Sequence, residues 1–215
     1  MSYQINISVV VPLFNEVESI PELTQWISRV MYEHGFSYEL ILVDDGSNDG
    51  SWEKIMELSA EDQNIKALRF NRNYGKSAAL NTGFKHTTGK IVITMDADMQ
   101  DSPDEIPDLY RMVHEDKYDL VSGWKKKRHD PISKTIPSKL FNYVTRLFSG
   151  IPLHDFNCGL KAYRREVVKD VRVIGELHRY IPVLAHLEGY RVGVIPVQHH
   201  PRQFGVTKYG WSRLL

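Results

Sequence analysis

The sequence lacks the features that mark several large classes of protein. Cys158 is the single cysteine among 215 residues, so no disulfide can form within the chain, and we expect this residue to pack rather than react. No apolar run approaches the roughly 18 residues of a spanning helix, so the chain is expected not to cross a bilayer by itself. The N-terminus also lacks the basic and apolar segments of a secretory signal, which indicates a cytoplasmic location.

Neither sign of charge is in excess, because Lys and Arg together number 27 and Asp and Glu together number 27. A globally basic surface for nucleic acids is therefore not expected, and no nucleic-acid partner is predicted. The glycine-rich pattern GxGxxG is missing after the first expected strand, and GxxxxGK[ST] is missing throughout. These absences argue against a dinucleotide-dependent oxidoreductase and a P-loop enzyme.

What is present is an alternation of short β-branched runs and longer segments with helical spacing, typical of an α/β protein. Expected strands are Ile5–Val11, Glu39–Val43, Ile65–Phe70, Lys90–Met95, Asp119–Ser122, Leu160–Arg164 and Val192–Val197. Expected helices are Ser19–His34, Ser51–Ala60, Ser77–His86, Pro103–Glu115, Ser138–Phe148 and Arg179–Leu187. This order predicts a single domain with a Rossmann-like, doubly wound, mostly parallel sheet covered by helices on both faces. Ligands of such sheets bind at the carboxyl ends of the strands.

The most informative segment is Asp96-Ala97-Asp98-Met99-Gln100-Asp101, which follows a buried strand directly. On an extended chain, side chains two residues apart point the same way, so Asp96, Asp98 and Gln100 would project together. Neighbouring carboxylates repel unless a cation lies between them, and their oxygens suit Mg²⁺ or Mn²⁺. The alternative is a solvated turn in which Asp101 caps the next helix.

Acids also follow two other expected strands. Asp44 and Asp45 precede a turn that contains Gly46, and their oxygens can accept hydrogen bonds from a base or a ribose. Turn formation and helix capping explain much of this segment equally well. Pro12, Phe14 and Glu16 follow the first strand and would lie at the same edge of the sheet.

Basic residues occur near the same edge. Arg72 and Lys76 flank the start of a helix, an arrangement that favours anions, although a plain surface turn is the alternative. The segment 124–146 carries seven cations against Asp130, and beside an anionic membrane such charges contribute about 1 kcal/mol each. The apolar stripe at 138–148 is expected mostly to pack in the core.

In order and spacing, five segments resemble the inverting family 2 glycosyltransferases of GT-A fold. They are Pro12–Glu16, Asp44–Gly50, Asp96–Asp101, Asp155–Lys161 and Arg202–Tyr209. The form of the third segment and the ending His200–Tyr209 are most similar to the polyprenyl-phosphate glycosyltransferases, the group of dolichol-phosphate mannose synthase. The resemblance covers almost the whole chain. Members of that group commonly continue into membrane-spanning helices, so we expect 1–215 to be a soluble catalytic domain cut short before membrane-associated segments, with the full-length protein at the cytoplasmic face of the plasma membrane.

The resemblance implies a role for individual residues. A nucleotide-sugar donor, with UDP or GDP, would be bound by Pro12, Phe14, Glu16, Leu42, Asp44, Asp45, Asp96 and Ala97, with Arg202 and Lys208 closing over its diphosphate. A divalent cation, Mg²⁺ or Mn²⁺, would be held by Asp96, Asp98 and Gln100, and Asp98 and Asp155 would be catalytic. The phosphate of a polyprenyl-phosphate acceptor would be received by Lys125, Lys134 and Ser138. Relatives often carry Arg where this chain has Lys125 and Lys134, which keeps the charge without the bidentate geometry.

Three other functions remain open. A saccharide acceptor would use the same donor chemistry, but its hydroxyl group would need a general base. A phosphatase of the haloacid dehalogenase type also places DxD after a strand, yet its nucleophilic Asp usually follows the first strand, where this chain has Pro12-Leu13-Phe14. A module that binds nucleotide sugars without turnover is the non-enzymatic reading.

Overall fold

The computed structural model describes residues 5–115, 117–126, 142, 145–147, 150–151 and 153–201. Its strands are β1 (Ile7–Leu13), β2 (Tyr38–Asp44), β3 (Ile65–Arg69), β4 (Ile91–Thr94), β5 (Leu120–Lys125), β6 (Lys161–Arg164) and β7 (Val192–Val197). Its α-helices are α1 (Ile20–Glu33), α2 (Ser51–Glu61), α3 (Lys76–His86), α4 (Ile106–His114), α6 (Arg165–Asp170) and α7 (Ile181–Leu187). Two short 3₁₀ helices are η1 (Pro103–Glu105) and η2 (Leu177–Tyr180).

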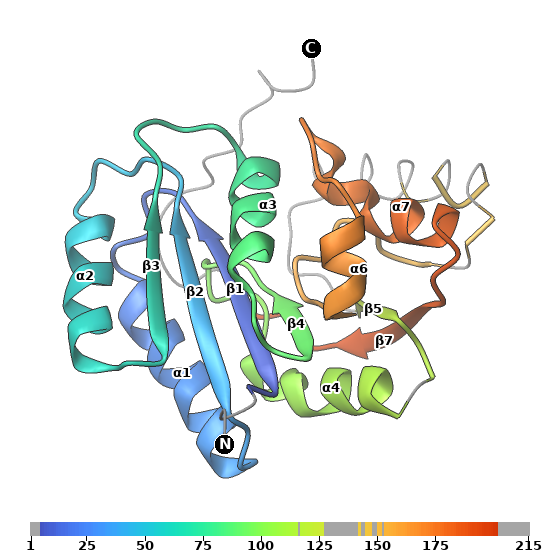
Figure 1. Ribbon diagram of the computed structural model, residues 1–215, viewed down its shortest axis with the longest axis horizontal. Helices are drawn as coiled ribbons and strands as arrows, with labels where there is room; N and C mark the ends of the chain where they lie inside the picture. The colour runs from blue at the N-terminus through green and yellow to red at the C-terminus, as the bar shows by residue number, and fades with distance from the viewer. Residues whose placement is uncertain are drawn as a thin grey trace.

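All these strands form one sheet in the order β3-β2-β1-β4-β6-β5-β7 (Figure 1). β1 is parallel to β2 and to β4, β2 is parallel to β3, and β5 is parallel to β7. Only β6 runs antiparallel to its two neighbours in the described sheet. The prediction of a mostly parallel α/β sheet is therefore confirmed. The carboxyl ends of β1, β2 and β4 meet at one edge, where the predicted acids follow.

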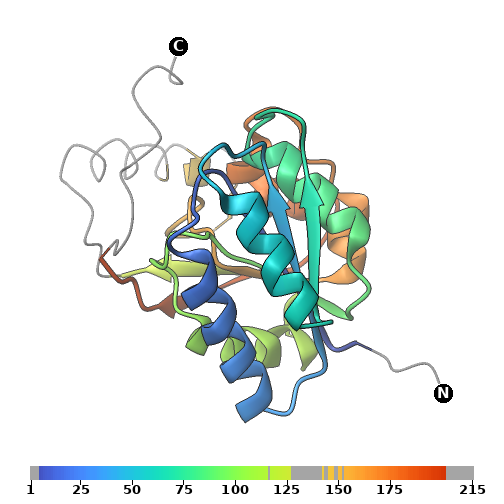
Figure 2. The ribbon, with the colours of Figure 1, turned by 90° about the vertical axis from the view of Figure 1, so that its left-hand side faces the viewer.

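Helices cover both faces of the sheet, which explains why the central strands are continuous apolar runs. Val9, Val10 and Val11 of β1 are fully buried. On one face α1, α2 and α4 pack against the sheet, and on the other face α3, α6 and α7 do so. Figure 2 shows α1 and α2 on one side of the strands and α3 and α6 on the other. The apolar stripe predicted for the first helix is buried, including Leu23 and Ile27.

The structure corrects several element boundaries. The helix expected over Pro103–Glu115 begins as η1 and continues as α4, and α6 was not predicted at all. β5 extends to Lys125 instead of ending at Ser122, because its last residues pair with Ile195–Val197 of β7. The helix expected over 138–148 lies mostly outside the described residues.

Candidate active site

Two loops at the carboxyl edge of the sheet, residues 14–19 and 45–50, are joined by hydrogen bonds. The N–H of Asn15 donates to Ser47 Oγ over 2.8 Å, and the N–H of Asn48 donates to Asn15 Oδ1 over 2.9 Å. The N–H of Glu16 donates to Ser51 Oγ over 2.9 Å. Asn15 has a φ of 55°, a left-handed conformation that asparagine adopts more readily than most residues. The polar residues of these turns therefore fix the two loops against each other.

Asp44 and Asp45 are both engaged within the protein. Asp44 is fully buried, and its Oδ1 accepts the N–H of Ser47 over 2.9 Å. Asp45 accepts the N–H groups of Tyr74 and Gly75 over 2.7 and 2.9 Å. Asp44 therefore shapes the turn after β2, and Asp45 ties that turn to the segment that leads into α3.

Gly46 allows these two segments to approach each other closely. Its φ is +75°, and a Cβ at this position would lie 2.5 Å from the backbone carbonyl carbon of Arg72. The guanidinium of Arg72 stacks over the ring of Tyr74, 4.8 Å from its centroid. A residue with a side chain at position 46 would push the Arg72 backbone away from the carboxyl edge of the sheet.

Of the other residues predicted to line a nucleotide, some lie at the carboxyl edge of the sheet and others lie in the core. Pro12 lies near the end of β1 and lines the pocket described below. Phe14 and Glu16 are half-buried in the loop after β1. Leu42 and Ala97 are only 1% and 4% exposed and belong to the core beneath α1, α2 and α4. Their side chains pack in the core, so they support the carboxyl edge of the sheet without facing a ligand there.

The acidic segment begins where β4 ends, at Thr94. The side chains of Asp96, Asp98 and Gln100 are half-buried, whereas the residues between them are buried. This alternation was predicted from an extended backbone, but the structure produces it in a turn in which Met99 has a φ of 60°. The N–H of Gln100 donates to Asp98 Oδ1 over 3.3 Å, which keeps these two side chains at the same turn.

Lys76, the first residue of α3, forms an ion pair with Asp96. Burial alone would raise the pKa of Asp96, but the charges of Lys76, Lys125 and Lys161 lower it to about 2. Gly159 lies directly against this carboxylate, because a Cβ there would come within 2.6 Å of Asp96 Cγ. Asp96 is thus held ionised between α3 and the turn before β6.

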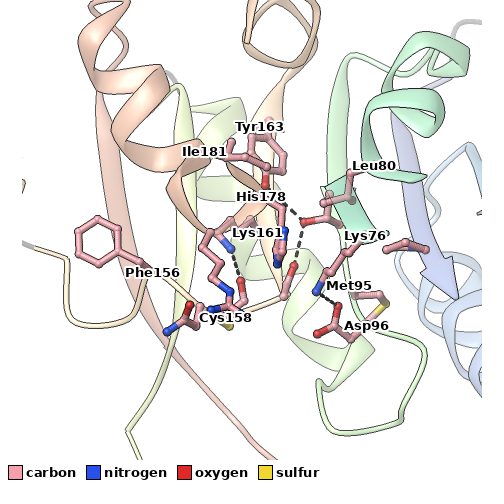
Figure 3. Close-up of a pocket in the computed structure, with 15 residues that line it drawn as sticks. Lys76, Leu80, Met95, Asp96, Phe156, Cys158, Lys161, Tyr163, His178 and Ile181 are labelled. Atoms are coloured by element: carbon pink, nitrogen blue, oxygen red, sulfur yellow. Dashed lines mark hydrogen bonds and ion pairs between the residues drawn. The ribbon is translucent and has the colours of Figure 1, made fainter. Parts of the chain in front are cut away.

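A small pocket of about 20 Å³ lies beside this ion pair (Figure 3). The end of β4, the start of α3, the turn before β6 and η2 bound it. Its charged lining residues are Lys76, Asp96, Lys161 and Arg179. Figure 3 shows His178 between Lys161 and Lys76, so segments from both halves of the chain meet here.

His178 joins η2 to α3. Its Nδ1 lies 2.9 Å from Ser77 Oγ, and its backbone N–H donates to the same oxygen over 3.2 Å. Burial, assisted by the charges of Lys76 and Arg179, lowers the pKa of His178 to about 3, so the ring is neutral near pH 7. Sequence reasoning placed Arg179 at the start of a helix and did not assign His178 or Arg179 to a site. The available signal was a His-Arg pair immediately before an apolar helix.

Lys125 is buried against Asp101. Its Nζ lies 2.8 Å from Asp101 Oδ1, and the two side chains are 12% and 0% exposed. Burial alone would lower the pKa of Lys125, but the Asp101 carboxylate raises it overall. Asp101 also forms an isolated β-bridge with His199. Lys125, predicted to help receive an acceptor phosphate, therefore has its charge balanced within the protein.

Asp155, predicted to be catalytic, shapes the turn that leads into β6. It is 1% exposed, its Oδ1 accepts the N–H of Asn157 over 3.0 Å, and its carbonyl accepts the Ser122 hydroxyl over 3.4 Å. The described lining of the pocket does not include it. Cys158 is also buried, and burial raises the pKa of its thiol to about 12, which agrees with a packing role.

Some predicted features fall outside this geometry. Lys134, Ser138, Arg202 and Lys208 lie outside the described residues. Within the described part of the chain, no helix is both long and apolar enough to cross a membrane.

The pattern of the family described as glycosyl transferase family 2 matches residues 8–172. The chain belongs to this family. A curated relative, dodecaprenyl-phosphate galacturonate synthase of Rhizobium johnstonii, is 37% identical over 213 residues. The match covers 97% of this chain and 63% of the relative, so the chain spans less than two thirds of that protein. The predicted family is confirmed.

Solved structures confirm the predicted GT-A glycosyltransferase fold. The mannosyltransferase PcManGT from Pyrobaculum calidifontis, in complex with GDP-Man and Mn²⁺, is similar with a TM-score of 0.67 and 23% identity, over 91% of this family 2 chain and 56% of that chain. Glucosyl-3-phosphoglycerate synthase from Mycobacterium tuberculosis, in complex with Mn²⁺ and UDP-Glc, is similar with a TM-score of 0.73 and 20% identity, over 97% and 73%.

The residues after β4 fit a divalent cation that takes most of its ligands from a substrate. Asp98 and Gln100 offer a carboxylate and an amide oxygen at the rim, and such hard donors suit Mg²⁺ or Mn²⁺. The Asp96 carboxylate is paired with Lys76. Among the described residues, no group of three or more His, Cys, Asp or Glu side chains is arranged to hold a metal. A cation here would therefore need phosphate oxygens and water to complete its coordination.

Proposed function

We propose that this family 2 chain is the catalytic domain of a metal-dependent, inverting glycosyltransferase. It moves a sugar from a nucleoside-diphosphate sugar to a polyprenyl phosphate. The name of the Rhizobium relative supports the lipid acceptor and adds galacturonate as the first sugar to test. The GDP-Man, UDP-Glc and Mn²⁺ bound in the similar structures support a nucleotide-sugar donor and a divalent cation.

The donor lies across the carboxyl edge of the sheet in this proposal. The loops after β1 and β2 take the base and ribose, and their mutual hydrogen bonds keep that surface preformed. Asp98 and Gln100 would hold the cation next to the diphosphate. When bound, the cation neutralises the charge that develops on the leaving diphosphate. Lys76 and Asp96 lie beside this point and orient the donor.

The pKa values of the side chains that line the pocket indicate which kind of acceptor the enzyme uses. A sugar hydroxyl needs a general base with a pKa near the working pH. The carboxylate and the imidazole that line the pocket, Asp96 and His178, have pKa values of about 2 and about 3, which makes both weak bases. A phosphate monoester is already ionised near neutral pH, since its second pKa is about 6. The pocket therefore favours a phosphate acceptor.

The acceptor attacks the anomeric carbon from the face opposite the diphosphate. One phosphate oxygen forms the new bond while the bond from the anomeric carbon to the diphosphate oxygen breaks, so the configuration inverts. We further propose that the whole protein acts at the cytoplasmic face of the membrane that contains its lipid acceptor. There, each Lys or Arg near the anionic leaflet contributes about 1 kcal/mol to binding.

The test is a transfer assay with purified protein, Mn²⁺ or Mg²⁺, a panel of UDP- and GDP-sugars, and short polyprenyl phosphates alongside saccharides. We expect a lipid-phosphate sugar as product. Product with saccharides alone would instead establish the other acceptor class. Phosphate release from simple esters would indicate a phosphatase, and tight donor binding without turnover would indicate a binding module. Each of these three outcomes rejects the proposal.

A further inference from the structure

Arg179 is an exposed residue that lines the pocket. Lys76 is paired with Asp96, and Lys161 Nζ donates to the carbonyl oxygen of Cys158. Arg179 makes no hydrogen bond or ion pair with any other residue that the structure describes, although it lines the same pocket. Three basic side chains thus line the pocket with one carboxylate, and although burial lowers the pKa of Lys161, Lys76 and Arg179 leave the lining attractive to a negative group.

The position of Arg179 is fixed by the neighbouring residue. His178 is bonded through its ring and its backbone to Ser77 of α3, so η2 cannot shift without breaking those contacts. His178 itself remains neutral and does not compete with Arg179 for an anion. A guanidinium presented in this way can bind a carboxylate through two parallel hydrogen bonds, a geometry that Lys cannot provide.

The location of the pocket indicates which part of the substrate reaches it. The pocket shares Asp96 with the segment whose Asp98 and Gln100 would hold the cation beside the diphosphate in the proposed function. The sugar is attached to that diphosphate, so it is the group nearest to the pocket. Neutral sugar hydroxyl groups would not balance the positive lining, whereas a carboxylate would.

We propose that the sugar of the donor lies at the open side of this pocket and that Arg179 binds a carboxylate on it, so that the transferred sugar is a hexuronic acid. This inference rests on the proposed function. The same charge would suit another anion, the phosphate of the acceptor. The two sources differ in which substrate loses affinity when Arg179 is replaced.

The first experiment measures donor binding by calorimetry with Mn²⁺ present. The probes are UDP-galacturonate and UDP-glucuronate against UDP-galactose and UDP-glucose, and GDP-mannuronate against GDP-mannose. We expect the wild type to bind a uronate more tightly than its neutral counterpart. Arg179→Gln should weaken uronate binding by about 10- to 100-fold, the range for a lost hydrogen bond to a charged group, and leave neutral sugars within about twofold.

Two further variants separate charge from geometry. Arg179→Lys should recover only part of the uronate affinity. Arg172→Gln removes an exposed arginine from the same segment outside the pocket and should change nothing. Equal binding of uronates and neutral sugars by the wild type, or an equal loss of both in Arg179→Gln, would overturn the proposal.

Steady-state kinetics then distinguish the two sources of the anion. In Arg179→Gln, we expect a higher KM for the uronate donor and an unchanged KM for polyprenyl phosphate. A higher KM for polyprenyl phosphate with every donor would assign Arg179 to the acceptor and reject the uronate reading. If no donor is transferred to polyprenyl phosphate, the proposed function fails, but the binding measurements still decide whether Arg179 recognises a carboxylate.

Discussion

The Ser77 hydroxyl lies 2.9 Å from Nδ1 of His178, although the two residues are 101 positions apart in the sequence. The same oxygen accepts the backbone N–H of His178 over 3.2 Å. Ser77 follows Lys76 at the start of α3, and His178 precedes Arg179 in η2. One hydroxyl group therefore joins the two cation-bearing walls of the pocket.

Protonation of His178 should destabilise the fold. Its pKa falls from an ordinary value near 6.5 to about 3 on folding, so between these values the unfolded chain binds more protons. Stability should thus be complete above about pH 6.5 and decline as the pH falls, by up to about 1.4 kcal/mol per pH unit. Urea unfolding at pH 7 and pH 5 measures this. In His178→Asn the difference between the two pH values should shrink, and an unchanged difference would show that other groups cause it.

Two glycines should respond differently to replacement by alanine. Gly46→Ala places a Cβ 2.5 Å from the Arg72 backbone at a φ of +75°, so it should cost at least about 2 kcal/mol of unfolding free energy. Gly159→Ala meets the Asp96 carboxylate at 2.6 Å, and this flexible side chain can move aside. It should cost less than about 1 kcal/mol but reduce transfer, because Asp96 leaves its position beside Lys76. Urea unfolding and a transfer assay on both variants test the contrast, which equal destabilisation would contradict.

Asp98→Asn should abolish transfer without unfolding the protein. Asp98 is half-buried, and an Asn oxygen can also accept the hydrogen bond that the Gln100 N–H donates to Asp98 Oδ1. Loss of the negative charge should weaken the cation site and lower kcat by at least about 100-fold. Asp108→Asn, on the exposed face of α4, is the matched control and should keep full activity. Retention of more than half the activity in Asp98→Asn would exclude the metal role.

The sequence predicted the first half of the fold well because each central strand is a continuous apolar run such as Val9–Val11 and each helix has a clear period. It failed where structure depends on distant pairing. The last residues of β5 look like the start of a basic loop, and they become a strand because β7, about seventy residues later, pairs with them. α6 spans six residues, too few to display a helical period.

In the candidate site, too, features set by local sequence patterns were predictable and features set by distant contacts were not. The acids after β1, β2 and β4 were predictable, because carboxyl ends of parallel strands meet at one edge. Their partners were not. Lys125 belongs to a run of lysines that suggests a solvated face, yet the fold buries it against Asp101. Arg179 lines the pocket, and its neighbour His178 bonds Ser77 across the molecule. Such contacts arise from tertiary packing, which local sequence patterns do not encode.

The pH dependence of transfer should follow the acceptor instead of the protein. Asp96 and His178, with pKa values of about 2 and about 3, do not titrate between pH 5 and 9. A phosphate monoester loses its second proton near pH 6, so kcat/KM for polyprenyl phosphate should rise through about pH 6 and then stay level. A polyprenyl phosphonate, which holds its second proton more tightly, should move the midpoint upward. If the pH midpoint is the same for the phosphate and the phosphonate but shifts in His178→Asn, the imidazole acts as a base.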